Sequence, residues 1–336
     1  MKALVFKGPH NVAMEDRDMP RIGPDEVLIQ TKYASICGTD LKIMEGKFPA
    51  QKGLILGHEG SGIIEKIGKN VTHLKEGDPV IFEPYLICRR CIVCRSGRYN
   101  VCIDRRHLGI EADGVFSEYF KIPSYAVHPI PEGLPLEEAA LAEPTSVAYH
   151  AVTRLRPLPS DSVAVLGAGP IGLMALQSVR AFGSQKVIVS DVIEQRLQVA
   201  KNLGASRTVN SREENLFDVV MEETDGNYVD KVLEAVGIPE TIQQSVEIVR
   251  TAGRIGLVGI SEEPVSFNFL RLVRKEIDIV TSDASCMSYE KEPLLMAMGI
   301  LRVKDLISQV YNFEDILDAF ERAKEKKDIK ILIKFD

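Results

Sequence analysis

The stretch SVAVLGAGPIG, residues 162–172, places three glycines directly after an apolar segment with the character of a strand. The glycines follow the spacing G-x-G-x-x-G, which permits a tight turn, a close approach of backbone to a pyrophosphate, and close packing of a helix on a strand. The N-terminus of the following helix favours the negative charge of the phosphates. The segment therefore predicts a dinucleotide site. Its candidate cofactor-binding residues are Gly167, Gly169, Pro170, Ile171 and Gly172.

A second apolar segment, KVIVSD at 186–191, supports this interpretation because it ends in an acid. Asp191 lies nineteen residues beyond Gly172, where a carboxylate can accept hydrogen bonds from the adenosine ribose hydroxyls. A 2′-phosphate there would face a carboxylate, so NAD is favoured over NADP. Arg196 has two interpretations, a residue on the adenine side and a solvated helix residue. A glycine turn in an ordinary α/β domain is the alternative for the whole segment.

Apolar strands alternate with helical stretches from about residue 146 to 288. The alternation predicts a parallel sheet with right-handed crossovers and helices on both faces, a doubly wound Rossmann α/β fold. Residues 1–145 are instead rich in short, glycine-punctuated β segments. The end of the chain predicts two amphipathic helices, at 289–307 and 313–328, and a last strand at 329–335.

Length and composition limit the functional classes. A chain of 336 residues suggests two domains. A net charge of −7 without a long basic run argues against binding of nucleic acid. No apolar run approaches the roughly eighteen residues of a membrane helix, and the N-terminus lacks the features of a signal peptide. A cytoplasmic location is therefore expected.

The segment CRRCIVCRSGRYNVC, residues 88–102, holds four of the six cysteines. In a reducing compartment, clustered cysteines bind metal more often than they form disulfides. Four thiolates can close a tetrahedron around zinc and leave no open position, which makes such a site structural. A redox cluster and free thiols are the alternatives. The predicted ligands of this structural zinc lobe are Cys88, Cys91, Cys94 and Cys102.

A second set of candidate ligands is dispersed along the chain. Cys37 lies in ASICGTDLK, His58 in LGHEGSG and Glu143 in EPTSVAYHAV. A thiolate, an imidazole and a carboxylate can bind zinc and leave a fourth position open, as in catalytic sites. Taken singly, Cys37 can also be a small core residue and Glu143 a carboxylate at a helix start.

With these motifs the sequence resembles the zinc-containing medium-chain alcohol dehydrogenases over essentially its whole length. The pair Glu143-Pro144 is similar to the branch of sorbitol-type polyol dehydrogenases and L-threonine 3-dehydrogenases. The resemblance implies a GroES-like catalytic domain from 1–145 and 289–336 around an NAD-binding Rossmann domain at 146–288. The supporting segments are CGTD at 37–40, GHEGSG at 57–62, the four-cysteine lobe, EPTSV at 143–147, GAGPIG at 167–172 and LGA at 203–205.

The resemblance also implies two zinc ions per subunit, one catalytic and one structural, together with NAD. Cys37, His58 and Glu143 would surround the catalytic zinc, with Glu59 as an alternative or additional ligand; which glutamate binds directly stays open. Asp40 would accept a hydrogen bond from the free ring nitrogen of His58.

Three further residues receive roles from the resemblance. Thr39 is similar to the hydroxyl residue that takes the alcohol proton. Lys42 stands where many relatives carry an outer histidine, and it can hold a cofactor phosphate, hold a charged substrate, or be solvated. Lys330 matches a position whose basic side chain reaches the cofactor pyrophosphate, with an exposed charge as the alternative. The histidines expected to be packed or capping residues are His10, His73, His107, His128 and His150.

The sequence therefore predicts an NAD-dependent dehydrogenase that oxidises a secondary alcohol of a polar small molecule, such as a polyol, a sugar acid or L-threonine. Oxidation of simple alcohols, or a non-catalytic NAD- or zinc-binding protein on the same scaffold, are the alternatives. A homo-oligomer is expected, with a tetramer favoured, a dimer as the alternative, and 254–269 as a pairing edge.

Overall fold

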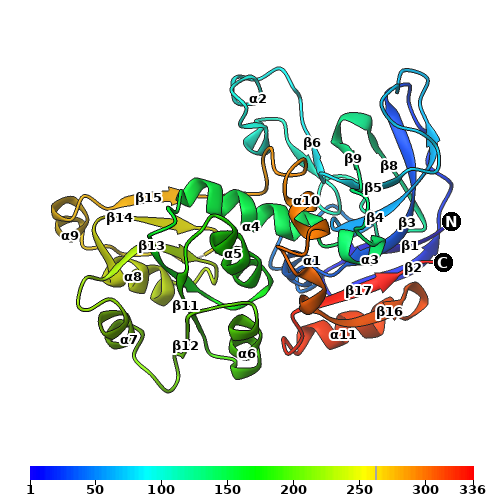
Figure 1. Ribbon diagram of the computed structural model, residues 1–336. Helices are drawn as coiled ribbons and strands as arrows, with labels where there is room; N and C mark the ends of the chain where they lie inside the picture. The colour runs from blue at the N-terminus through cyan, green and yellow to red at the C-terminus, as the bar shows by residue number, and fades with distance from the viewer. Residues whose placement is uncertain (262) are drawn as a thin grey trace. The chain divides into compact units, whose positions relative to one another are not determined.

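A computed structural model describes residues 1–261 and 263–336 of the chain (Figure 1). The chain forms two compact units. The first contains residues 1–143, 289–297 and 303–336, and the second contains residues 144–288 and 298–302. The division lies near the start of helix α4, Ala142–Leu155.

The second unit is built on a six-stranded, all-parallel sheet in the order β12-β11-β10-β13-β14-β15 (Figure 1). The central strands are almost continuously apolar because both of their faces are covered. The predicted Rossmann α/β class is confirmed. The strands are β10 (Ser162–Leu166), β11 (Lys186–Asp191), β12 (Arg207–Asn210), β13 (Val229–Glu234), β14 (Val249–Leu257) and β15 (Asp278–Thr281).

Helices connect these strands, as parallel pairing requires. Helix α5 packs on β10 and β11, α6 packs on β11 and β12, and α8 packs on β13 and β14. The helices are α5 (Pro170–Ala181), α6 (Glu194–Asn202), α7 (Leu216–Glu223), α8 (Pro239–Ile248) and α9 (Phe269–Arg274).

The first unit is β-rich, as the GroES-like prediction requires. Its main sheet has the order β16-β17-β3-β4-β5-β9, and β8 also pairs with β3. Two smaller ribbons pair β1 with β2 and β6 with β7. The strands are β1 (Lys2–Gly8), β2 (Asn11–Asp16), β3 (Glu26–Ser35), β4 (Gly60–Ile67), β5 (Pro79–Phe82), β6 (Tyr85–Leu86), β7 (Arg106–His107), β8 (Tyr119–Pro123), β9 (Val127–Pro129), β16 (Ile307–Asn312) and β17 (Lys330–Lys334).

The last strand joins the two ends of this unit. Strand β17 pairs antiparallel with β3, with Leu332 opposite Ser35, and α11 packs on β17 (Figure 1). A buried core that includes Ile29, Phe116 and Phe320 lies beneath these elements. The helices are α1 (Gly38–Met44), α2 (Ile92–Arg95), α3 (Leu136–Ala139), α10 (Glu292–Ala297) and α11 (Ile316–Lys324), with 3-10 turns at Tyr99–Val101, Ser124–Ala126, Val303–Leu306 and Phe313–Asp315.

Two expectations from the sequence are wrong. The helix expected over 289–307 is only the short α10 followed by a 3-10 turn, because Gly299 adopts a φ of 69° that ends regular helix. The pairing edge expected at 254–269 contains only four residues of β14, 254–257, and this strand lies between β13 and β15 with both edges paired. The outer strand is β15. Residue 262 of the expected edge lies outside the described residues. Among the described residues, no helix combines the length and the apolar character needed to cross a membrane.

Candidate functional site

The glycine turn connects β10 to α5 in the second unit. Gly167 has a backbone φ of 98°, which residues with a side chain rarely adopt. A Cβ on Gly172 would lie 1.8 Å from the carbonyl oxygen of Gly167, so only glycine allows the helix to approach the strand this closely. Helix α5 begins at Pro170 with Gly169 as its N-cap, and proline suits this first helical position.

Asp191 ends β11 beside this turn. One carboxylate oxygen accepts the backbone N–H of Ala168 at 2.7 Å, and the other accepts those of Val192 and Ile193 at 2.7 and 2.9 Å. The three bonds hold the carboxylate at the rim of a hollow of about 440 Å³, which Gly167, Gly169 and Arg196 also line. The turn, the acid and Arg196 are therefore together in space, as a dinucleotide site requires.

The four cysteines of 88–102 form one cluster. One sulfur from each lies within 4.8 Å of the others. The sulfur of Cys102 is 3.5 Å from that of Cys88 and 3.9 Å from that of Cys91. A tetrahedral Zn–S₄ centre with bonds near 2.3 Å has sulfurs about 3.8 Å apart, so the cluster fits zinc.

The chemistry of these thiols also fits a metal. Backbone N–H groups, those of Cys94 and Ile103, lower the pKa of Cys91 to about 6, so this sulfur is a thiolate at neutral pH. Burial and hydrogen bonds from neighbouring thiols raise the pKa of Cys94 to about 12. Four sulfurs this close cannot all ionise without a cation between them. All six cysteines are free of disulfides.

The second cluster lies in the first unit and joins Cys37, His58 and Glu59. One ligand atom from each residue lies within 4.8 Å of the others. Cys37 is the N-cap of α1, while His58 and Glu59 directly precede β4. A thiolate, an imidazole and a carboxylate are a donor set of catalytic zinc sites.

Asp40 lies behind the imidazole of this cluster. Its carboxylate is fully buried, accepts the backbone N–H of Cys37 at 2.9 Å, and lies 3.5 Å from Nδ1 of His58. Burial opposes a charged ring, but the negative charges of Asp40 and Cys37 outweigh it and raise the pKa of His58 well above its ordinary value. The site therefore favours positive charge, and a zinc ion fits it.

Glu59 has two partners besides the cluster. Ser35 Oγ and Lys330 Nζ both donate to Glu59 Oε2, and Lys330 Nζ also donates to the carbonyl of Ile36 at 3.2 Å. Lys330 is only 3% exposed. Burial opposes its charge, but Glu59 and then Cys37 raise the pKa of Lys330. Lys330 is thus part of the metal cluster's surroundings, and its role toward the cofactor phosphate stays a prediction.

Glu143 is a buried carboxylate near this cluster but is not within its shared sphere. Tyr85 donates its hydroxyl to Glu143 Oε1 at 3.0 Å. Burial, followed by the charge of Glu59, raises the pKa of Glu143 to about 7. The two glutamates therefore differ in position: Glu59 joins the ligand cluster, and Glu143 lies beside it.

The remaining predicted residues occupy α1. Thr39 is half-buried in its first turn, two residues after Cys37, and Lys42 is half-buried in its last turn. The structure brings both onto the helix that begins at Cys37. Their predicted roles in proton transfer and charge recognition stay predictions.

Sequence reasoning gave no role at the metal cluster to three residues that lie near it: Ser35, Tyr85 and His107. His107 was expected to be a packed residue, and it does pack, but its neighbour is His58: the ring centroids are 4.9 Å apart. Burial, followed by the charge of His58, lowers the pKa of His107 to about 3. No local pattern marks these residues, because their positions depend on strand pairing in three dimensions.

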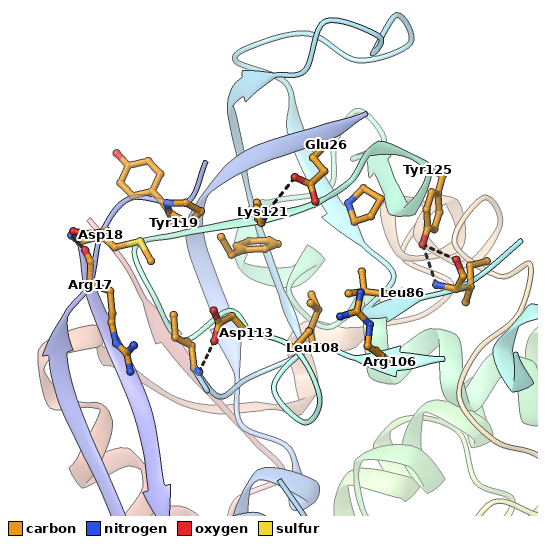
Figure 2. Close-up of a pocket in the computed structure, with 18 of the residues that line it drawn as sticks. Arg17, Asp18, Glu26, Leu86, Arg106, Leu108, Asp113, Tyr119, Lys121 and Tyr125 are labelled. Atoms are coloured by element: carbon orange, nitrogen blue, oxygen red, sulfur yellow. Dashed lines mark hydrogen bonds and ion pairs between the residues drawn. The ribbon is translucent and has the colours of Figure 1, made fainter. Parts of the chain in front are cut away.

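A separate pocket of about 860 Å³ lies elsewhere in the first unit (Figure 2). Its walls carry both signs of charge, with Glu26 and Lys121 paired at 3.2 Å, together with Leu86, Leu108 and other apolar groups. It contains none of the residues of the Cys37 cluster. Volume alone therefore does not locate the chemistry.

Comparison with known proteins gives consistent matches. Residues 23–132 match the alcohol dehydrogenase GroES-like domain, and residues 170–298 match the zinc-binding dehydrogenase family. Sorbitol dehydrogenase of Bacillus subtilis is 36% identical over 99% of this chain and 97% of its own length. D-xylulose reductase A of Aspergillus oryzae is 36% identical over 98% of this chain and 96% of its own.

Solved structures agree. The alcohol dehydrogenase TADH of Thermus sp. ATN1 has a TM-score of 0.96 and 31% identity, and the match covers 100% of both chains. A protein described as a short chain alcohol dehydrogenase, from Escherichia coli CFT073 and in complex with NADH, has a TM-score of 0.95 and 30% identity, with 100% of this chain and 99% of that chain covered. A zinc-binding dehydrogenase of Sinorhizobium meliloti bound to NADP has a TM-score of 0.94 and 28% identity, with 99% and 98% covered.

Proposed function

Because the chain belongs to the zinc-containing medium-chain alcohol dehydrogenases, we propose that it oxidises a secondary alcohol group of a polyol, with NAD as the hydride acceptor. The coarser assignment, a zinc-binding, NAD(P)-dependent dehydrogenase of the polyol type, follows from the family. The observation that carries the proposal is the cluster of Cys37, His58 and Glu59, with ligand atoms within 4.8 Å of one another. A structural zinc site alone would not require it.

Cys37, His58 and Glu59 would hold the catalytic zinc, and Glu143 would serve as a second carboxylate beside it. Their geometry supports Glu59 over Glu143 as the carboxylate ligand. Cys88, Cys91, Cys94 and Cys102 would hold the structural zinc. When bound, the catalytic zinc supplies Lewis-acid activation of an alcohol oxygen, and NAD supplies the hydride acceptor.

The residues of α1 would handle orientation and the proton. Asp40 fixes the ring of His58 by facing Nδ1, which leaves the other ring nitrogen for the metal. Thr39 Oγ1, two residues beyond Cys37, would accept the alcohol proton and pass its own toward solvent. Lys42, four residues beyond Gly38 on the same helix, would place a positive charge near the substrate or a cofactor phosphate.

Asp191 supports NAD over NADP. Its carboxylate is held at the rim of the hollow by three backbone N–H groups, and a 2′-phosphate at that place would meet its negative charge. Arg196, which lines the same hollow, would contact the adenine side. Relatives have been solved with either nucleotide, so the two cofactors must be compared directly.

A homo-oligomer, with a tetramer favoured over a dimer, is part of the proposal. Strand β15 is the outer strand of the parallel sheet, and Ile279 on it is 36% exposed. Nearby in sequence, α9 exposes Phe269 and Val273 by 73% and 70%. Unpaired edges and exposed apolar side chains are typical of subunit contacts. A cytoplasmic location is consistent with the free cysteines.

The proposal is tested with the zinc-loaded protein, NAD or NADP, and a panel of sorbitol, xylitol, an aldonic acid, L-threonine and short aliphatic alcohols. We expect NADH formation with a polyol, and loss of that activity in Cys37→Ala but not in the matched thiol control Cys286→Ala. Activity with only the aliphatic alcohols would favour the simple alcohol dehydrogenase. Intact NAD binding without turnover of any alcohol would favour a binding protein.

A further inference from the structure

The ribbon of β6 and β7 has two different faces. Tyr85 pairs with His107 and Leu86 pairs with Arg106. Because side chains alternate along a strand, Leu86 and Arg106 share one face, and Figure 2 shows both lining the 860 Å³ pocket. Tyr85 and His107 belong to the opposite face and line no part of that pocket.

This opposite face borders the metal cluster. The ring of His107 is edge-on to that of His58, with centroids 4.9 Å apart, and edge-on to that of Tyr85, with centroids 5.0 Å apart. Tyr85 in turn donates to Glu143 at 3.0 Å. The ring of His107 therefore lies between a metal ligand and the tyrosine that holds the neighbouring carboxylate.

The hydrogen bonds of His107 define its tautomer. Nδ1 lies 2.7 Å from the carbonyl oxygen of Leu108, which can only accept, so Nδ1 carries the proton. The backbone N–H of His107 donates to Glu111 at 2.8 Å, which holds the strand end in place. Among the described residues, Nε2 of His107 has no hydrogen-bond partner, and this atom is not fully buried. In the neutral ring Nε2 is a free acceptor.

We propose that His107 is a substrate contact that selects polyols, its Nε2 accepting a hydrogen bond from the hydroxyl next to the one that is oxidised. This inference rests on the proposed function, because it needs an alcohol held at the Cys37, His58 and Glu59 cluster. An acceptor that loses its access to water when substrate binds favours substrates that supply a donor and discriminates against those that leave it unpaired. A simple secondary alcohol has no second hydroxyl to offer.

The test compares 2,3-butanediol with 2-butanol, which differ by one hydroxyl. His107→Phe retains an aromatic ring but removes both nitrogens, and His107→Gln retains a polar group. In His107→Phe we expect kcat/KM for the diol to fall about tenfold, because one hydrogen bond is lost. The kcat/KM for 2-butanol should change less than about threefold. His107→Gln should recover part of the loss. His73→Phe, at an exposed histidine bonded to Ser124, should resemble the wild type.

Two measurements do not depend on turnover. The dissociation constant of the diol for the NADH complex, measured by calorimetry, should rise about tenfold in His107→Phe. Nitrogen NMR of the histidine rings should show Nε2 of His107 without a proton in the free protein. If His107→Phe does not fold, the same ratio is measured in His107→Gln, together with the NMR signal.

An equal fall for both alcohols would overturn the proposal, because His107 would then only support the ring of His58. Unchanged diol affinity in both variants, or a protonated Nε2, would also overturn it. Failure of the proposed function is a different result: the wild-type protein itself would oxidise neither a polyol nor the diol.

Discussion

Replacing Gly172 by alanine tests whether the glycine turn is built by packing. The added Cβ would lie 1.8 Å from the carbonyl oxygen of Gly167, 2.9 Å from its carbonyl carbon and 3.5 Å from Val165 Cγ1. The first contact is with backbone, so α5 must move away from β10. Overpacking of this kind costs about 1–3 kcal/mol, and we expect the upper end, about 3 kcal/mol. For a unit of this size the melting temperature should fall by about 6–12 °C.

Gly169 in the same turn is the matched control. A Cβ there meets no atom within 4 Å, and its φ of −71° suits alanine. Gly169→Ala should therefore change the stability of the cofactor-free protein by less than about 1 kcal/mol. The same methyl group would stand where the pyrophosphate approaches the backbone, so the dissociation constant for NAD should rise at least tenfold, about 1.4 kcal/mol.

The two variants are compared by scanning calorimetry without cofactor and by titration with NAD. The two variants should show opposite patterns: Gly172→Ala loses stability, and Gly169→Ala loses affinity for NAD at normal stability. A melting temperature for Gly172→Ala within about 2 °C of the wild type would refute the packing argument. Wild-type NAD affinity in Gly169→Ala would show that the cofactor phosphates do not approach this turn.

Three further predictions concern the metal sites. Chelation of zinc, or Cys94→Ser, should lower the melting temperature by at least about 5 °C, because the clustered sulfurs then lack a cation. Cys286→Ser is the control. A structural metal would be contradicted if the chelated protein and Cys94→Ser melted at the same temperature as the zinc-loaded wild type. Asp40→Asn should weaken zinc binding about 10–100-fold in a chelator competition, because the ring of His58 loses its charged partner. The control is Asp104→Asn, at an exposed residue, which should bind zinc as the wild type does. Wild-type zinc affinity in Asp40→Asn would show that the carboxylate has no role in metal binding. In the zinc-free protein, burial raises the pKa of Glu143 to about 7. The protonated carboxyl therefore contributes stability that is fully present below the unfolded pKa near 4.5 and is lost as the pH rises through about 7. The free energy of unfolding should fall by about 3 kcal/mol in total over this range. Denaturant titrations from pH 4 to 8 should show a steeper decline in the wild type than in Glu143→Gln, and parallel pH profiles would disprove this role.

The fold class was predictable because its signals are local. The turn at 167–172 and the acid at Asp191 depend on the backbone of one strand, one turn and one helix. The repeated strand–helix pattern leads to a parallel sheet because connections are short and right-handed. The helix expected at 289–307 shows the limit of such reasoning: amphipathic spacing continues through the segment, but Gly299 turns the backbone away.

The sequence by itself determined the cofactor turn and the four-cysteine cluster, since in each case the chemistry lies within a few consecutive residues. The catalytic cluster is different. Lys330 reaches Glu59 only because β17 pairs with β3, and Glu143 meets Tyr85 across 58 residues of chain. His107 faces His58 and not the 860 Å³ pocket because it pairs with Tyr85 in the two-strand ribbon of β6 and β7. A shift of one residue in this register would turn its side chain to the other face. Sheet order and register decide such contacts, and they result from the packing of the whole core.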